Sequence, residues 1–286
     1  MVWGTTFITT KILLKEFTPV EILFTRFILG LAALTLAYPR RLKGLSAKQE
    51  LMLAGAGLTG VTLYYLLENV ALSISYASNV GVLVSISPCI TAILASVFLK
   101  NERLAPSFFG GFAIAIVGII LISFNGTENF GLSPKGDIMA VAACFMWAIY
   151  SVIIKKVGEW GINNIQITRR IFAYGTLFML PFVAVMGYRV RPQLIFSLEF
   201  LPSFIYLGVI ASAACFATWN MAIKLIGAVK TSIYIYLIPV ITVVMSYFVL
   251  NEKITAMSFT GTALTLLGLI ISEGRLDFLF LKRKKA

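Results

Sequence analysis

The chain repeats one spaced pattern of residues in its two halves, and this repeat constrains the fold more than any other feature. Trp, Lys, Arg, Asn, Pro, Glu and two Gly occur in the same order twice, about 150 residues apart. Trp and Lys are 8 residues apart in both copies, Trp and Arg 23, Asn and Pro 19, Glu and Gly 9, and the two Gly 7; only Pro and Glu differ, at 14 and 13. The copies are Trp3, Lys11, Arg26, Asn69, Pro88, Glu102, Gly111 and Gly118, and Trp147, Lys155, Arg170, Asn220, Pro239, Glu252, Gly261 and Gly268. A duplicated apolar unit fused to itself is typical of a secondary transporter, whose solute path lies between the repeats.

The composition places the chain in a lipid bilayer. With 59% hydrophobic and 13% charged residues over 286 positions, the chain has more apolar surface than a soluble domain of this size can bury. It contains no His, and its only aspartates, Asp137 and Asp277, fall at predicted membrane surfaces. A His-based triad, a zinc site and an aspartyl pair inside the membrane are thereby excluded. We therefore expect no enzyme activity, no catalytic residue, no metal and no cofactor.

Polar residues and Pro/Gly turns cut the chain into ten apolar stretches of about the length, roughly 20 residues, that crosses a membrane core. These stretches are 1–14, 20–38, 51–71, 78–99, 105–124, 138–156, 166–187, 201–221, 230–250 and 256–273. Five stretches per half is an odd number, so the second copy must insert upside down relative to the first. The sequence therefore predicts an all-α integral membrane fold of ten transmembrane helices in two inverted five-helix repeats. The repeats are 1–124 and 138–273, with an inter-repeat loop at 125–137 and a basic tail at 274–286.

Most basic residues lie on one side of this topology. With both termini in the cytoplasm, fifteen Lys and Arg face the cytoplasm and six face the opposite side, as the positive-inside rule requires. The net charge of +12 is then mostly topological, and no nucleic-acid partner is needed to explain it. The expected partners are a small-molecule substrate and the lipid of the cell membrane, which the tail would contact. Whether the protein is a monomer or a homodimer stays open.

The first span is shorter than its counterpart in the second half. Ten residues of the predicted helix precede Trp147, from Asp137 onward, whereas two residues precede Trp3. We therefore expect the first helix to lack roughly two turns at its start.

These residues resemble those of the drug/metabolite transporter superfamily, in particular the ten-helix EamA family of bacterial exporters and permeases. In the first half the resemblance rests on Trp3-Gly4 running to Lys11, on Arg26, and on Ala71-Leu72 through Pro88 to Asn101-Glu102 with the glycines that follow. In the second half it rests on Trp147 to Lys155, Arg170, and Ala222 through Pro239 to Asn251-Glu252. The resemblance covers the whole chain and implies two inverted repeats around a central cavity. It also implies movement of amino acids, metabolites or drugs across the membrane, usually outward.

Two pairs of equivalent residues interrupt predicted spans. Pro88 and Pro239 fall in mid-span, where proline removes a backbone hydrogen bond and kinks the helix. We expect them to shape a gate or the cavity; the alternative is that they are tolerated kinks. Asn69 and Asn220 lie in apolar helices 19 residues before the prolines. Either they line a cavity, or they fix packing through an interhelical hydrogen bond.

The repeats differ beside these asparagines, where one half has Glu68 and the other Trp219. Glu68 is the only carboxylate in a central stretch of any predicted span, so it is the best-placed acid to bind an ammonium or carry a proton. A position at the outer membrane surface is the alternative. Transport is then either proton-coupled through Glu68 or not proton-coupled, and Trp219 at the related position favours the uncoupled case.

Aromatic residues in the helices that the resemblance assigns to the cavity form a further group of candidates. They could stack on a flat or cationic solute, or serve only in packing. The group consists of Trp147, Tyr150, Tyr64, Tyr65, Tyr234 and Tyr236.

The remaining repeated residues have mainly structural interpretations. Glu102 and Glu252 follow the fourth helix of each repeat, where capping of the next helix is favoured over transport chemistry. Arg26 and Arg170 are expected to snorkel or to pair within the bundle. The repeated glycines predict close helix packing.

Taken together, the sequence predicts an alternating-access permease that moves amino acids or related small metabolites outward. A transporter of drugs or nucleotide sugars is the nearest alternative. A lipid-linked sugar flippase, which would need a lateral opening between helices, is another.

Overall fold

The computed structural model describes residues 2–75, 77–100, 105–123, 133–187, 191–250 and 255–273, and every regular element in these ranges is helical. Within them, eight helices or helical runs are long and apolar enough to cross a membrane: Pro19–Ala37, Ala47–Ala71, Val80–Phe98, Pro106–Ser123, Pro134–Gly158, Asn164–Met186, Leu201–Ile226 and Ala228–Met245. The expected all-α membrane fold is therefore confirmed. The first and last expected spans correspond to shorter helices, so the count of ten stays a prediction.

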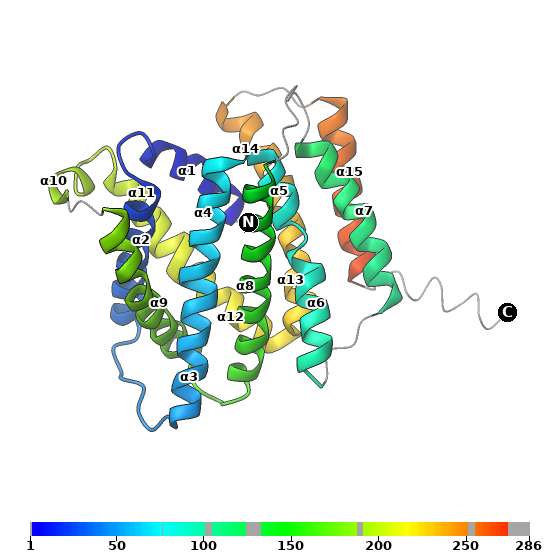
Figure 1. Cartoon of the computed structure of the whole chain (residues 1–286). Coiled ribbons are helices and arrows are strands. Elements are labelled where there is room, and N and C mark those ends of the chain that lie inside the picture. Colours follow the sequence, from blue (N-terminus) through cyan, green and yellow to red (C-terminus); the bar gives the residue numbers. More distant parts are fainter. Residues whose placement is uncertain are drawn as a thin grey trace.

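The spans stand side by side in one bundle, with α8 near its middle (Figure 1). In chain order the elements are η1 (Val2–Thr5), α1 (Thr6–Leu13), α2 (Pro19–Ala37), α3 (Ala47–Ala56), η2 (Gly57–Leu63), α4 (Tyr64–Ile74), α5 (Ala77–Val84), α6 (Ser87–Phe98), α7 (Pro106–Ser123), α8 (Pro134–Gly158), α9 (Asn164–Met186), α10 (Pro192–Ile195), α11 (Leu201–Ile205), η3 (Tyr206–Ala214), α12 (Cys215–Ile226), α13 (Ala228–Ile233), η4 (Tyr234–Tyr236), α14 (Leu237–Leu250) and α15 (Ala256–Ser272). The helix α8 begins at Pro134 and not at 138, because proline suits the first turn of a helix and Asp137 adds a favourable negative charge there.

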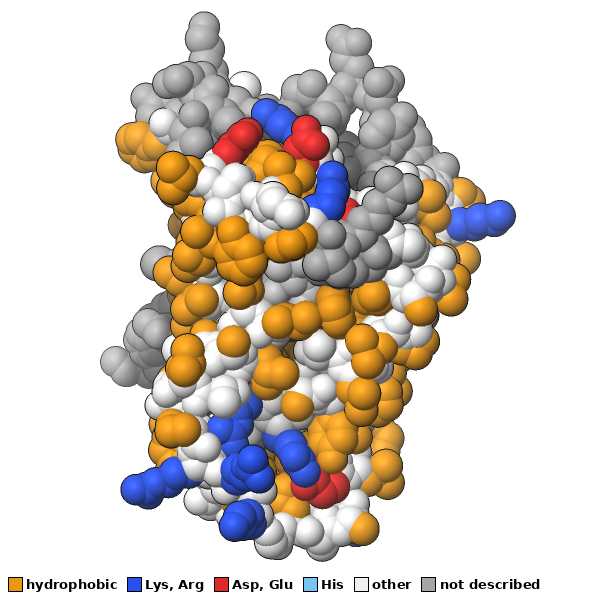
Figure 2. Space-filling model, turned by 90° about the vertical axis from the view of Figure 1, so that its left-hand side faces the viewer, with side chains coloured by type: hydrophobic (Ala, Val, Ile, Leu, Met, Phe, Trp, Pro, Cys, Tyr) orange, Lys and Arg blue, Asp and Glu red, His pale blue; other side chains and the backbone are white. Residues whose placement is uncertain are grey.

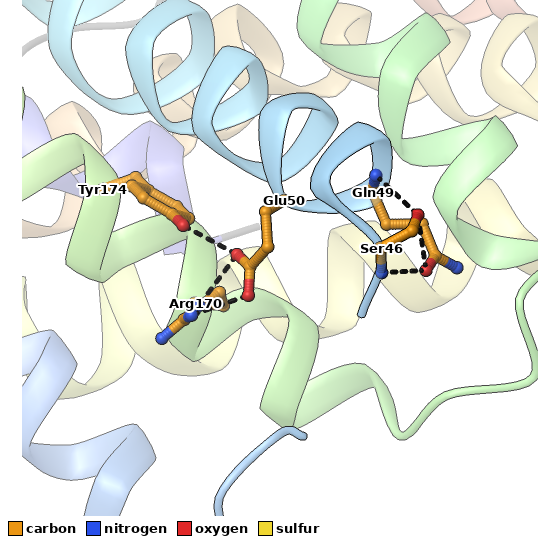
Figure 3. A network of polar contacts seen from close by, with 5 residues as sticks. All are labelled: Ser46, Gln49, Glu50, Arg170 and Tyr174. Carbon is orange, nitrogen blue, oxygen red and sulfur yellow. Dashed lines mark hydrogen bonds and ion pairs between the residues drawn. The ribbon is translucent and has the colours of Figure 1, made fainter. Parts of the chain in front are cut away.

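Reciprocal capping boxes mark the starts of α2 and α3. At the start of α2, Thr18 Oγ1 accepts a hydrogen bond from the Glu21 N–H at 3.4 Å, and the Glu21 carboxylate accepts one from the Thr18 N–H at 2.7 Å. Ser46 and Gln49 form the same capping box at the start of α3 (Figure 3). In each case a Thr or Ser stands three residues before a Glu or Gln, which is a local signal for a helix start.

Two spans contain a wide, π-helical turn at equivalent positions of the two halves. The turn η2 begins at Gly57, and η3 includes Gly208, 151 residues later, which is also the spacing of the repeated asparagines. A Cβ on Gly57 would lie 2.7 Å from the backbone nitrogen of Gly175 in α9, and a Cβ on Gly208 would lie 2.7 Å from Cβ of Leu29 in α2. Glycine thus lets each π-helical turn contact a helix of the other half at close range. Turns of this kind occur often at functional sites.

The helices α7 and α15 pack against each other through the repeated glycines. Gly111 faces Gly268 and Gly118 faces Gly261, so that a Cβ on any of the four would lie 2.5 or 2.6 Å from the carbonyl oxygen of its partner. This pairing order means that the two helices run antiparallel, side by side at the edge of the bundle (Figure 1). The expected close packing at these glycines is confirmed.

Both expected mid-span prolines follow a break in their helix. The span predicted at 78–99 is interrupted between α5 and α6, and the span predicted at 230–250 is interrupted by η4. Pro88 is the second residue of α6 and Pro239 the third residue of α14. In the first turn of a helix the missing N–H of proline leaves no intrahelical hydrogen bond unmade. Pro88 and Pro239 are therefore tolerated because each lies in the first turn of the helix that follows the break.

Apolar side chains cover the middle of the molecule, and charged side chains gather at its ends. Figure 2 shows an apolar belt between one end with mostly Lys and Arg and another end with both signs of charge. Leu36, Val185 and Phe248 are 83%, 86% and 72% exposed. Such exposure of large apolar groups is expected where lipid, not water, surrounds a helix.

Candidate substrate site

Three tryptophans from the two halves of the chain meet inside the bundle. The ring centroid of Trp3 (η1) lies 5.6 Å from that of Trp147 (α8) and 5.1 Å from that of Trp219 (α12), and the last two are 5.8 Å apart. We call these residues the tryptophan cluster. Because Trp3 and Trp147 are equivalent in the repeat, their meeting brings the two halves together at one point. Trp3 was absent from the predicted site, although its repeated position was a signal for it.

Tyrosine and phenylalanine rings surround the tryptophan cluster. Trp147 has its centroid 4.9 Å from Tyr64 and 5.2 Å from Tyr150. Most pairs in this region are edge-to-face, the arrangement that the charge distribution of aromatic rings favours. Phe216 is central to it, with centroids at 5.1 to 6.3 Å from those of Trp3, Phe27, Tyr65, Trp147, Tyr150 and Phe172.

Two of the three indole N–H groups in the tryptophan cluster have no hydrogen-bond partner among the described residues. Trp3 Nε1 donates to the carbonyl oxygen of Ala211 in η3 at 2.9 Å. The Nε1 atoms of Trp147 and Trp219 are buried and make no hydrogen bond within the described structure. A buried donor without an acceptor costs about 1–3 kcal/mol, and such groups are rare in native proteins. The cluster therefore has two donors available for an acceptor from outside the protein.

A carboxylate and a guanidinium lie beside the tryptophan cluster. Tyr64, whose ring contacts Trp147, donates its hydroxyl hydrogen to Oε1 of Glu68 at 3.0 Å. Arg26 is only 5% exposed; its Nε donates to Ser212 Oγ at 2.9 Å, and its guanidinium carbon lies 5.0 Å from the ring centroid of Tyr65, the neighbour of Tyr64. Arg26 therefore lies inside the bundle and does not face lipid. Glu68 is half-buried near both groups, so the site has negative and positive charge as well as aromatic faces.

The two repeated asparagines have different surroundings. Asn220 is 1% exposed; its Oδ1 accepts a hydrogen bond from the Tyr150 hydroxyl at 2.6 Å, and its Nδ2 donates to Thr168 Oγ1 at 3.1 Å. These bonds join α8, α9 and α12. Asn69 is half-buried, and its Nδ2 donates to the carbonyl oxygen of Tyr65 in its own helix at 2.8 Å. A role for either asparagine in lining a solute path stays a prediction.

The other predicted candidates fall elsewhere. Tyr234 is 37% exposed in η4. Pro88 is buried at the start of α6, and Pro239 is half-buried in α14. Glu102 and Glu252 lie outside the described residues, so their capping or transport roles stay predictions.

Among the residues that the structure describes, two ion pairs join the halves of the chain, and neither was predicted as a pair. Arg170 Nη2 lies 2.6 Å from Glu50 Oε1, and Tyr174 donates its hydroxyl hydrogen to Glu50 Oε2 at 2.7 Å (Figure 3). Arg191 Nη2 lies 3.3 Å from Glu21 Oε2. The partners are 120 and 170 residues apart in sequence, so only the fold brings them together. Arg170 therefore pairs with a carboxylate of another helix, which was one of its two expected roles, while 42% of its side-chain surface stays exposed.

An open cleft of 1650 Å³ lies at one end of the bundle. The C-terminal part of α8 lines it, together with the ends of α6 and α12 and the starts of α3, α7 and α13. Along α8, Ile149, Val152 and Lys156 line the cleft, whereas Trp147 and Tyr150 belong to the aromatic region. One face of α8 therefore lines the cleft, and another face of the same helix contributes Trp147 to the tryptophan cluster.

The chain is similar over most of its length to known transporters. The model of the EamA-like transporter family matches residues 1–124 and 134–273. An uncharacterized transporter of Archaeoglobus fulgidus is 29% identical, over 96% of this chain and 94% of that protein. A probable terminal-alkyne amino-acid exporter of Streptantibioticus cattleyicolor is 24% identical, over 96% of this chain and 90% of that protein. A probable amino-acid metabolite efflux pump of Escherichia coli is 23% identical, over 95% of this chain and 91% of that protein.

A solved crystal structure has the same fold. It superposes with a TM-score of 0.78 over 97% of this chain and 94% of the other chain. The two sequences are 19% identical. At this level of identity the likeness concerns the fold alone.

Proposed function

Because the chain belongs to the EamA-like transporter family, we propose that it is an alternating-access permease that carries amino acids or related small metabolites out of the cell. Its family and its apolar helices make it a multi-pass membrane transporter. The names of the Streptantibioticus and Escherichia coli relatives support the substrate class and the outward direction. In this proposal both termini face the cytoplasm. The test is a fusion after Ala286 of a reporter enzyme that functions only outside the cytoplasm. Activity of this fusion would contradict the proposed orientation.

Reciprocal contacts between the halves support ten helices in two inverted repeats. Gly57 and Gly208 occupy equivalent places, and each packs a π-helical turn against a helix of the other half. The contact of Gly111 with Gly268 between α7 and α15 is repeated with the halves exchanged, because Gly261 and Gly118, their respective equivalents, also face each other. Reciprocal pairs of this kind are what a two-fold relation between repeats produces. In alternating access the halves would rock about the tryptophan cluster, where they meet.

The two unpartnered indole N–H groups are the observation that carries the substrate class. An amino acid has a carboxylate, which accepts hydrogen bonds, and an ammonium group, which binds carboxylates and aromatic faces. Trp147 and Trp219 supply two buried donors, and Glu68 supplies a carboxylate a short distance away through Tyr64. We assign the substrate carboxylate to the two indoles and the substrate ammonium to Glu68. The surrounding rings then contact the apolar part of the solute.

Phenylalanine substitutions test this assignment because they remove the indole N–H and keep an aromatic ring. In proteoliposomes loaded with radiolabelled amino acids, Trp147→Phe and Trp219→Phe should each lower efflux at low concentration at least about tenfold, since a hydrogen bond to a charged acceptor contributes roughly 1.5–3 kcal/mol. Efflux of the corresponding decarboxylated amines should change much less. Trp160→Phe, outside the tryptophan cluster, is the matched control. Equal losses for amino acids and amines would overturn the assignment of the carboxylate.

The proline breaks are proposed to act as gates in the same cycle. Pro88→Ala and Pro239→Ala should slow transport while membrane insertion stays unchanged, because alanine lets the two half-helices join across the break. Pro106→Ala, at an unbroken helix start, is the control. Unchanged efflux in both variants, measured at equal protein content per vesicle, would leave the prolines a purely structural role.

A further inference from the structure

The cleft at the end of the bundle is lined by several lysines and by large apolar side chains. Lysines from four elements or their ends line it, and two glutamates, Glu159 and Glu273, are the acidic residues among its lining. Residues of α6, α8 and α13 line the cleft, and α6 packs against both of the other helices; the lower parts of α6 and α8 lie side by side in Figure 1. Its lysines are Lys48, Lys100, Lys155, Lys156 and Lys230.

No lysine of the cleft is neutralised by an ion pair within the described part of the chain, where the ion pairs found are those of Glu50 and Glu21. Lys155 Nζ donates to the carbonyl oxygen of Lys224 at 3.4 Å, and Lys156 Nζ lies 6.0 Å from the ring centroid of Phe98. These contacts hold the ammonium groups of Lys155 and Lys156 in position, but a carbonyl oxygen and an aromatic ring carry no net negative charge. Like charges gathered at the mouth of a low-dielectric cleft attract an anion from outside.

The wall of the cleft contains large apolar side chains that the protein leaves exposed. Phe98 is 57% exposed and Phe145 44%, on α6 and α8, and Leu225 is 69% exposed at the end of α12. A small soluble anion would cover the lysines and leave this wall bare. An amphiphile with an anionic head and apolar chains would cover both.

We propose that this cleft binds an anionic phospholipid, with its headgroup phosphate among the lysines and an acyl chain along the wall that contains Phe98 and Phe145. Basic pockets between transmembrane helices suit such headgroups, because each Lys near an anionic lipid surface adds to binding. The stems of the lysines can lie along the apolar wall while their ammonium groups reach the phosphate. The proposal does not depend on the nature of the transported solute.

Trp160 lines the cleft and supplies a direct reporter. The full chain is reconstituted in phosphatidylcholine vesicles, and its tryptophan fluorescence is measured as brominated phosphatidylglycerol or brominated phosphatidylcholine is added. We expect the brominated phosphatidylglycerol to quench at lower mole fraction, and Trp160→Phe to remove this component. Lys156→Gln and Lys230→Gln should each weaken the anionic-lipid preference about fivefold. Lys43→Gln, a basic residue outside the cleft lining, should leave it unchanged.

Each alternative gives a different result. Equal quenching by the two lipids, or a preference that survives the Lys156→Gln and Lys230→Gln double variant, overturns the proposal. Loss of the preference on addition of inorganic phosphate, but not of chloride at the same ionic strength, means that the cleft takes a soluble phosphate and not a lipid. A folding defect is recognised by size-exclusion chromatography, and in that case Lys48→Gln replaces the failing variant.

Discussion

Replacing Gly111 by leucine should lower the stability of the folded bundle by about 1–3 kcal/mol, the usual cost of overpacking a tight contact, and more if the backbones must separate. A Cβ on Gly111 would lie 2.5 Å from the carbonyl oxygen of Gly268 and would also contact Ser272. Because the obstacle is backbone, rotation of a side chain cannot relieve it. The stability is measured as the midpoint of unfolding in detergent, on heating or with added dodecyl sulfate.

The neighbouring glycine provides the control. A Cβ on Gly110 would have no atom of the protein within 4 Å, so Gly110→Leu adds the same side chain to the same helix without a clash. It should leave the midpoint nearly unchanged, or raise it slightly, because leucine is a better helix former than glycine. Similar midpoints for the two variants would mean that α7 and α15 do not pack through Gly111.

The second large effect is expected at Glu68. If its carboxylate binds the substrate ammonium, Glu68→Gln should reduce amino-acid efflux at least about tenfold, because charge-assisted hydrogen bonds contribute roughly 1.5–3 kcal/mol. Amide and carboxylate have nearly the same size, so the loss reports the charge and not the packing. Glu199→Gln, at an exposed position, is the control. Unchanged efflux of amino acids in Glu68→Gln would remove Glu68 from the site.

An imposed pH gradient in the same proteoliposomes examines coupling. Transport without proton coupling is the favoured case, so the efflux rate of the native protein should be the same with and without the pH gradient. If it does respond, the response should vanish in Glu68→Gln, because the other carboxylates within the predicted spans, Glu21 and Glu273, stand at the first turn or the last residue of theirs. Gradient-stimulated efflux that persists in Glu68→Gln would assign the proton to another group.

Local and compositional features were readable from the sequence. The apolar spans and the close-packing glycines depend on residue type and short spacing, and the structure contains both. The capping boxes at Thr18 and Ser46 are local signals of the same kind, but the predicted helix starts did not rest on them, and α3 begins at Ala47 and not at 51. The repeat also indicated which residues are equivalent. It did not indicate that the equivalent prolines restart helices after a break, because a proline can either kink a helix or begin one.

By itself, then, the sequence determined the membrane class, the duplication and the approximate positions of the spans, since these follow from composition, repeat spacing and the polar, proline and glycine residues between apolar stretches. Only the tertiary structure decided that Trp3 meets Trp147 and Trp219, that two indole N–H groups stay without acceptors, and that Glu50 pairs with Arg170. The reason is physical. These groups are far apart in sequence, and their contact depends on how apolar helices pack, which in a membrane is decided by close backbone approach and interhelical hydrogen bonds and not by hydropathy.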